Sequence, residues 1–105
     1  MNIIICGAGQ VGYSIANQLS QQGHSITVID KTSSDIQKIN DNLDVKGIVG
    51  IATYPSVLEL ADAKNADMII AVTRNDETNM IVCQIAHSLF NVSRKIARIR
   101  SKEFL

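Results

Sequence analysis

Residues 2–12 of the chain read Asn-Ile-Ile-Ile-Cys-Gly-Ala-Gly-Gln-Val-Gly, and this stretch decides the fold. The β-branched run from Asn2 to Cys6 predicts a strand, and the spacing of apolar residues from about Gln10 to Gln22 predicts a helix. A G-x-G-x-x-G loop that follows a strand directly and opens a helix is typical of a dinucleotide-binding turn. We therefore expect the loop residues to bind a nucleotide, namely Gly7, Ala8, Gly9, Gln10, Val11 and Gly12.

Each glycine of this loop has a separate task in that prediction. Gly7 permits the tight turn, Gly9 lets the backbone approach a pyrophosphate, and Gly12 lets the helix pack close to the strand. Asp30 follows the second predicted strand at the spacing where a carboxylate accepts the hydroxyls of an adenosine ribose and repels a 2′-phosphate. This favours NAD over NADP, although the adjacent Lys31 weakens the preference. The alternative is a glycine turn without a ligand and an aspartate that caps a loop.

The remainder of the chain alternates between strand and helix patterns. Further strands are predicted at Ser25 to Ile29, Gly47 to Val49, Met68 to Val72 and Ile96 to Ile99, and further helices at about Asp35 to Asn42, from Pro55, and at about Asp76 to Phe90. This alternation predicts an α/β fold, a Rossmann-like doubly wound parallel sheet of five strands with four helices. Such sheets often have a sixth strand, so we expect residues 1–105 to form a single domain that is truncated at its C-terminus.

Two further loops are placed near the nucleotide by the fold argument alone. The loop after the third strand, Gly50-Ile51-Ala52-Thr53, is expected beside the adenine. The end of the fourth strand, Thr73-Arg74-Asn75, is expected to face the glycine loop across the switch point of the sheet. For Thr73, Asn75 and Thr78 the alternative is helix capping and turn bonding.

Half of the basic residues of the chain gather around the last predicted strand. Alternation along a strand sets Arg98 and Arg100 on the same side, where they could form a paired clamp for a phosphate or a carboxylate. The alternative is a solvated edge of the sheet.

Composition argues against several classes of function. Ten basic and ten acidic residues give a formal net charge of zero, so no overall field favours nucleic acid. No apolar stretch approaches the roughly 20 residues that span a bilayer, and no secretory signal is visible, so we expect a cytoplasmic protein. Cys6 and Cys83 lie in apolar segments, and His24 and His87 stand alone. We therefore expect neither a metal site nor a catalytic centre.

The helix from about Asp76 to Phe90 carries more apolar residues than one sheet-facing stripe needs. We expect Val82, Ala86 and Leu89 to face the sheet, and Ile81 and Ile85 to face outward. Self-association would remove the resulting apolar patch from water, so we expect a homo-oligomer, either a dimer or a tetramer.

From Met1 to Leu105 the chain resembles the N-terminal nucleotide-binding domains of the RCK/KTN family. The marks are ICGAGQVG at residues 5–12, ITVID at 26–30, ADMIIAVTRNDETNM at 66–80, SLFN at 88–91 and IARIRS at 96–101. The block at 66–80 is more specific than the glycine loop, which dehydrogenases share. The resemblance implies binding of NAD(H) or, alternatively, of ATP or ADP, and assembly into dimers or larger rings. It also implies control of a Trk-type potassium transporter membrane subunit from the inner face of the cell membrane.

Two positions depart from the family pattern. Gln10 stands where some relatives that favour ATP carry Arg, which tilts this chain toward NAD(H). Ile51 stands where family members often carry Asp or His, which removes one polar contact near the adenine. Two other functions stay open: a fragment of an NAD-dependent dehydrogenase, and an interaction domain with a vestigial nucleotide site. The block at 66–80 favours a regulatory domain over the dehydrogenase fragment, whereas an interaction domain with a vestigial site would show no nucleotide binding at all.

Overall fold

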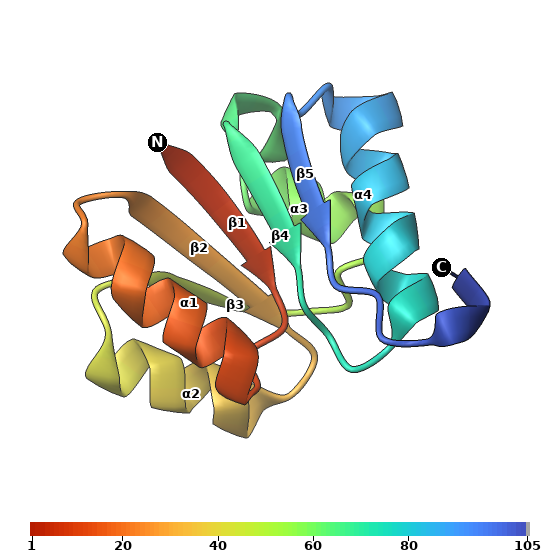
Figure 1. The fold of residues 1–105 in the computed structure, drawn as a ribbon. Coiled ribbons are helices and arrows are strands. Elements are labelled where there is room, and N and C mark those ends of the chain that lie inside the picture. The colour runs from red at the N-terminus through yellow and green to blue at the C-terminus, as the bar shows by residue number, and fades with distance from the viewer. Residues whose placement is uncertain (105) are drawn as a thin grey trace.

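The computed structural model describes residues 1–104, which form a sheet with helices on both of its faces (Figure 1). Five strands make up the sheet: β1 (Asn2–Cys6), β2 (Ser25–Asp30), β3 (Lys46–Val49), β4 (Met68–Ala71) and β5 (Arg94–Ala97). All neighbouring pairs are parallel, in the order β3-β2-β1-β4-β5. The chain moves outward from β1 in one direction and then returns to β4 on the other side. The predicted doubly wound sheet is confirmed, with its switch point between β1 and β4.

The helices divide between the two faces of the sheet. Figure 1 shows α1 (Gln10–Gln21) and α2 (Ser33–Asn42) on one face, and α3 (Pro55–Leu60) and α4 (Asp76–Phe90) on the other. Two short 3-10 helices, η1 (Ala63–Asn65) and η2 (Lys102–Phe104), were not predicted. Within residues 1–104, no helix combines the length and the apolar character needed to cross a bilayer.

The alternation of β1 side chains builds two separate cores. Ile3 and Ile5 are buried beneath α1 and α2, whereas Ile4 and Cys6 are buried on the α3 and α4 side. A strand that is apolar at every position is what a parallel sheet covered on both faces requires. The continuous apolar run of β1 therefore explains why it occupies the centre of the sheet.

Small residues, rather than large ones, form the buried face of α1. Gly12 and Ala16 are the buried residues of this helix, while Ile15 and Leu19 are half-buried against the same core. Val11, which the helical spacing also places toward the sheet, is 41% exposed. The helix lies close to the strands because Gly12 has no side chain, and this geometry turns Val11 away from the sheet.

The position of β5 corrects the sequence prediction. The strand covers Arg94–Ala97 instead of Ile96 to Ile99, because its register pairs Met68 with Arg94 and Ala71 with Ala97. Edge strands often carry charged residues, so the start of β5 at Arg94 was not marked by the apolar pattern used to predict strands. After the strand, the chain turns away from the sheet because the backbone N–H groups of Arg100 and Ser101 donate hydrogen bonds to the carboxylate of Asp76.

Helix α4 has the predicted bounds but not all of the predicted faces. Val82 and Ala86 are fully buried as expected, and Ile81 is 48% exposed as expected. Leu89 is 62% exposed and therefore points away from the sheet, contrary to the prediction. Ile85 is half-buried and packs against the core, so it does not belong to a freely exposed patch.

Candidate nucleotide-binding site

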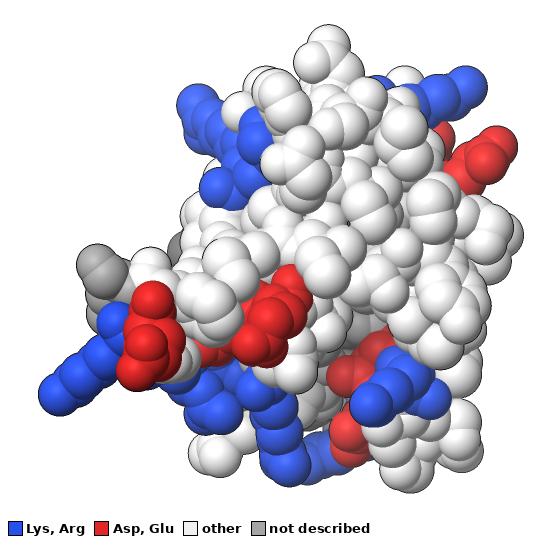
Figure 2. Space-filling view, turned by 90° about the vertical axis from the view of Figure 1, so that its right-hand side faces the viewer, with Lys and Arg blue, Asp and Glu red and all other residues white. Residues whose placement is uncertain are grey.

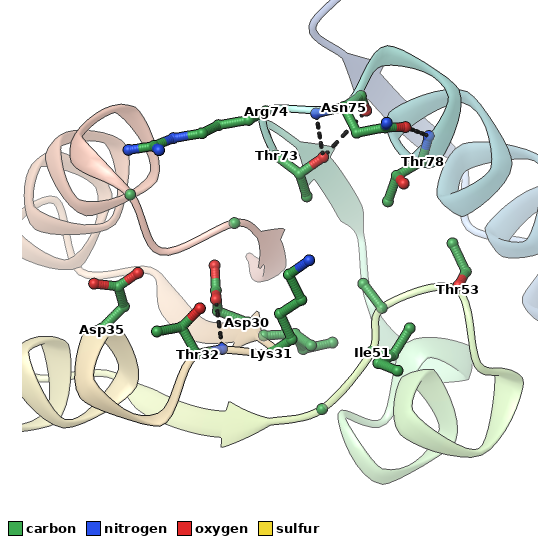
Figure 3. A pocket seen from close by; sticks show the side chains of 15 residues that line it. Asp30, Lys31, Thr32, Asp35, Ile51, Thr53, Thr73, Arg74, Asn75 and Thr78 are labelled. Atoms are coloured by element: carbon green, nitrogen blue, oxygen red, sulfur yellow. Dashed lines mark hydrogen bonds between the residues drawn. The ribbon is translucent and has the colours of Figure 1, made fainter.

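A large cavity lies at the carboxyl ends of the central strands. Its volume is about 530 Å³, within the range of about 300–1,000 Å³ typical of ligand sites. Figure 3 shows side chains from three loops around it: the ends of β2 and β3, and the loop between β4 and α4. This is the crevice at the switch point where open α/β sheets bind their ligands.

Two of the three loop glycines are required by the protein itself. Gly7 has a φ of +115°, and a Cβ atom there would lie 2.8 Å from the carbonyl oxygen of Val72. A Cβ atom on Gly12 would overlap the carbonyl oxygen of Gly7. The tasks predicted for these two glycines, the turn and the close packing of helix on strand, are thus visible in the backbone.

Gly9 differs from the other two glycines. Its φ of −71° and ψ of −166° are open to any residue, and no protein atom lies within 4 Å of the place its Cβ atom would take. Gly9 nevertheless borders the cavity. Neither backbone strain nor packing within residues 1–104 calls for glycine at this position. The open space over its backbone fits a ligand group that approaches the loop closely.

Three helices begin at the cavity, and only α1 leaves its N-terminus suited to an anion. Helix α1 has no side-chain cap and no acidic residue in its first turn. Helix α2 carries Asp35 in its first turn, and α4 carries Asp76 and Glu77 and is capped by the side chain of Asn75. Because unpaired N–H groups and the helix dipole attract anions, a phosphate is favoured at α1 and disfavoured at α4.

Asp30 joins the glycine loop to the loop after β2. One carboxylate oxygen accepts a hydrogen bond of 2.7 Å from the N–H of Ala8, and the other accepts one of 2.8 Å from the N–H of Thr32. A carboxylate has about four acceptor positions, so about two stay open toward the cavity that Asp30 lines. Asp30 therefore fixes the glycine loop and can still accept ribose hydroxyls.

The loop between β4 and α4 is held by Asn79, a fully buried residue that sequence reasoning missed. Its side-chain oxygen accepts hydrogen bonds from the N–H and the hydroxyl of Thr73, at 2.9 and 2.7 Å. Its side-chain nitrogen donates to the carbonyl oxygens of Thr73 and Arg98. Polar residues in helices are usually exposed, and only the fold shows that this one braces a wall of the cavity.

Thr73 and Asn75 both line the cavity and both stabilise the turn. The hydroxyl of Thr73 is bonded to Asn79, and the side-chain oxygen of Asn75 accepts a hydrogen bond of 2.7 Å from the N–H of Thr78. The capping role that the sequence left open is therefore real for Asn75, and it coexists with a place at the cavity.

The cavity brings together eight of the residues singled out from the sequence, namely Gly7, Gly9, Asp30, Lys31, Ile51, Ala52, Thr73 and Asn75. The other four residues of the glycine loop do not line the cavity. Ala8 and Gly12 are buried, and Gln10 and Val11 are exposed on α1. The lining also includes Gly50, Thr53 and Arg74 from the two loops that the fold argument placed near the nucleotide, and Thr78 from the first turns of α4. Ile29, Thr32 and Asp35 complete the lining and were not predicted. Their only signal in the sequence is that they lie close to the carboxyl end of β2, which meets the other strand ends at this edge of the sheet.

The expected clamp of Arg98 and Arg100 does not form. Both residues lie beyond the end of β5, so strand alternation does not set them on one side. The Arg98 guanidinium donates hydrogen bonds of 3.1 and 2.8 Å to the carbonyl oxygens of Val72 and Thr73, and neither arginine lines the cavity. Arg98 instead supports the wall from behind.

The cysteines show no reactive character. Both are free thiols, and Cys6 is completely buried. Burial raises the pKa of the Cys6 thiol far above its ordinary value, and burial also raises the pKa of Cys83 although nearby Lys95 opposes the change. Both side chains therefore stay protonated at neutral pH. Among residues 1–104, no group of three or more His, Cys, Asp or Glu side chains could hold a metal ion.

Solved structures share this architecture. The chain superposes on the TrkA-N domain of the inner membrane protein YbaL from Escherichia coli with a TM-score of 0.89, at 19% identity, covering 97% of this chain and 75% of that one. It also superposes on the Kef CTD of Shewanella denitrificans in AMP-bound form with a TM-score of 0.78, at 26% identity, covering 91% and 57%. The first likeness shows the fold alone.

Sequence comparison assigns the family. The chain is 49% identical over all 105 residues to the Trk system potassium uptake protein TrkA of Azorhizobium caulinodans, and it spans 23% of that relative's length. The relationship agrees with the resemblance inferred from the glycine loop and the block at 66–80. Residues 3–105 match the model of the TrkA-N domain, and the chain therefore belongs to the TrkA-N domain family.

Proposed function

We propose that the chain is a nucleotide-binding regulatory domain that binds NAD(H) in the switch-point cavity. The observation that carries the proposal is Gly9, where glycine serves no purpose within the described residues but leaves space for a phosphate beside the uncapped N-terminus of α1. Asp30 borders the same cavity at the end of β2, the position where this fold places a carboxylate for the hydroxyls of an adenosine ribose. ADP and ATP share these groups and are the alternative ligands, and the AMP bound by the Kef CTD of Shewanella denitrificans supports the adenosine end of the site.

The ribose end of the cavity favours a free 2′-hydroxyl over a 2′-phosphate. Asp30 and Asp35 border the cavity there, and Lys31 is the basic residue beside them. Two carboxylates outweigh one ammonium group in repelling the charge of a 2′-phosphate. We therefore favour NAD(H) over NADP(H). Asp35 strengthens this preference, which Asp30 and Lys31 alone had left weak.

The regulatory part of the proposal rests on the family. Relatives such as the protein of Azorhizobium caulinodans are named for Trk potassium uptake. We infer that nucleotide occupancy in this chain controls a potassium-transporting membrane subunit, with the domain at the inner face of the cell membrane. The cavity holds no arrangement of nucleophile, base and orienting group, so we assign binding without catalysis.

We also propose that the chain self-associates through the outer face of α4. Met80, Ile81 and Leu89 are 36%, 48% and 62% exposed. Figure 2 views the side on which α4 lies and shows a broad uncharged area in its upper right part, beside acidic side chains near the middle and charged groups of both signs in the lower half. A two-fold contact would cover the same residues on both subunits at once.

Titration calorimetry tests the nucleotide proposal. The wild-type chain is titrated with NADH, NAD, ATP and ADP, and Asp30→Asn is titrated in parallel. We expect NADH to bind, and the substitution to weaken it by about 1–3 kcal/mol through loss of charge-assisted hydrogen bonds to the ribose and weaker support of the glycine loop. Absence of heat with all four ligands, confirmed by unchanged thermal unfolding at millimolar ligand, would reject nucleotide binding and favour the vestigial site.

A further inference from the structure

Arg74 is a lining residue of the cavity whose role the proposed function does not yet assign. It lies in the loop between β4 and α4 and is exposed. Figure 3 shows its side chain running from this loop across the cavity toward the glycine loop, instead of folding back onto α4. The two loops belong to opposite sides of the switch point, so the guanidinium spans the crevice.

The charged residues around the cavity indicate what the Arg74 side chain can bind. Asp30 ends β2, Lys31 follows it, and Asp35 lies in the first turn of α2, so all three charged residues lie on the side where the ribose is proposed. The opposite wall contributes one charged lining residue, Arg74. The nearest carboxylate in sequence, Asp76, is engaged by the N–H groups of Arg100 and Ser101 and does not line the cavity. A negative group between the α1 N-terminus and Arg74 therefore meets positive potential from two sides.

The direction in which a bound nucleotide would run decides which of its groups lies there. With the ribose at Asp30 and the first phosphate at the glycine loop, the next group continues toward β4. We propose that Arg74 binds the second phosphate of a nucleoside diphosphate group and thereby selects diphosphate-containing nucleotides over monophosphates. The inference rests on the proposed function and names the part of the ligand that this arginine recognises. A guanidinium suits the task because its planar fork of donors matches phosphate oxygens.

Comparison of ADP, AMP and adenosine isolates the second phosphate. Arg74→Gln removes the charge and retains much of the side-chain length, and Arg94→Gln is the matched control because Arg94 is exposed at the amino end of β5, remote from the cavity. Calorimetric titration at low ionic strength should show ADP affinity reduced about tenfold in Arg74→Gln, with AMP changed less than about twofold, because one charge-assisted contact is lost. Adenosine should bind equally to all three proteins.

A second readout depends on charge alone. Salt weakens interactions between exposed charges, so the affinity of wild type for ADP should fall more steeply with added NaCl than that of Arg74→Gln. Arg74→Lys should restore part of the ADP affinity and of the salt dependence. Both variants change an exposed side chain, so far-ultraviolet circular dichroism and thermal unfolding should match wild type.

The outcomes separate this inference from the proposed function. If wild type binds ADP and Arg74→Gln binds ADP equally well, or loses ADP and AMP to the same degree, the second-phosphate role of Arg74 is overturned while nucleotide binding stands. If wild type binds none of the adenine nucleotides, the proposed function fails and the role of Arg74 fails with it. An equal loss in Arg94→Gln would show a nonspecific charge effect and would likewise overturn the assignment.

Discussion

Gly9 and Gly12 belong to the same sequence motif, yet alanine should affect them in opposite ways. At Gly9 the backbone angles suit alanine and its methyl group meets no protein atom within 4 Å. Loss of unfolded-state entropy stabilises such a change by about 0.4–1 kcal/mol, while the weaker preference for alanine at an N-cap costs up to about 1 kcal/mol. The free energy of unfolding should therefore change by less than about 1 kcal/mol.

Nucleotide binding should respond to Gly9→Ala much more than stability does. The new methyl group would occupy the space over the loop where the pyrophosphate is proposed to approach. Overpacking of this kind costs about 1–3 kcal/mol, which corresponds to a roughly tenfold to hundredfold loss of NADH affinity. Calorimetric titration with NADH measures the loss, and urea unfolding followed by circular dichroism measures stability.

Gly12→Ala, in contrast, should reduce the stability of the fold strongly. Its methyl group would overlap the carbonyl oxygen of Gly7, and a backbone atom cannot rotate aside as a side chain can. We expect a loss of about 3 kcal/mol or more, a large share of the roughly 5–15 kcal/mol that stabilises a typical domain. A Gly9→Ala protein that binds NADH within about twofold of wild type would refute the reasoning, because the methyl group would then not meet a ligand. A Gly9→Ala protein that unfolds would refute it too, because glycine would then serve the fold.

Four further predictions concern other parts of the molecule. Asn79→Ala should reduce the free energy of unfolding by about 2–4 kcal/mol, because buried hydrogen-bonding groups lose their partner; a loss below about 1 kcal/mol in urea unfolding would contradict the bracing role. Hydrogen bonds from the backbone N–H groups of Arg100 and Ser101 hold the pKa of Asp76 below its ordinary value. The ionised carboxylate of Asp76 therefore stabilises this turn fully at neutral pH, and the stabilisation is lost as the pH falls through the lowered pKa. Hydrogen exchange of the Arg100 and Ser101 N–H groups should accelerate only in strong acid. In Asp76→Asn this acid-induced acceleration should be absent. The double variant Ile81→Asp with Leu89→Asp should sediment as a monomer where wild type is an oligomer and should still bind NADH; a wild type that is monomeric at micromolar concentration would reject the α4 interface. The wild-type chain should not oxidise NADH with small carbonyl compounds, and a rate proportional to protein concentration in an absorbance assay would revive the dehydrogenase alternative.

The choice of Leu89 in that double variant shows where periodicity alone gave a wrong face. Ile85 and Leu89 are four residues apart, and both are apolar. The sheet beneath α4 ends at the edge strand β5, and in the folded chain Ile85 packs against the core whereas Leu89 is exposed to solvent. An aspartate at residue 85 would thus report on folding and not on association.

The sequence alone was sufficient for the fold class, for the strand and helix order, and for placing the glycine loop and Asp30 at the cavity. Continuous apolar strands alternate with helices, and a glycine loop between the first strand and helix admits few other folds. Asp30 could be assigned because its spacing from the loop is set by one helix and one strand. These signals are local, since each depends on residues that are close together in the chain.

Tertiary structure decided which of the remaining polar residues share a site. Arg98 and Arg100 looked like ligands because they are basic and two apart, but the chain leaves the sheet at Ala97, and Arg98 donates its hydrogen bonds to the backbone instead. Arg74 and Asp35 lie far apart in the chain and have no shared motif, yet they border the same cavity because parallel strands end at a common edge. A pattern in sequence reports the local backbone, whereas the partner of a charged side chain depends on segments that only folding brings together.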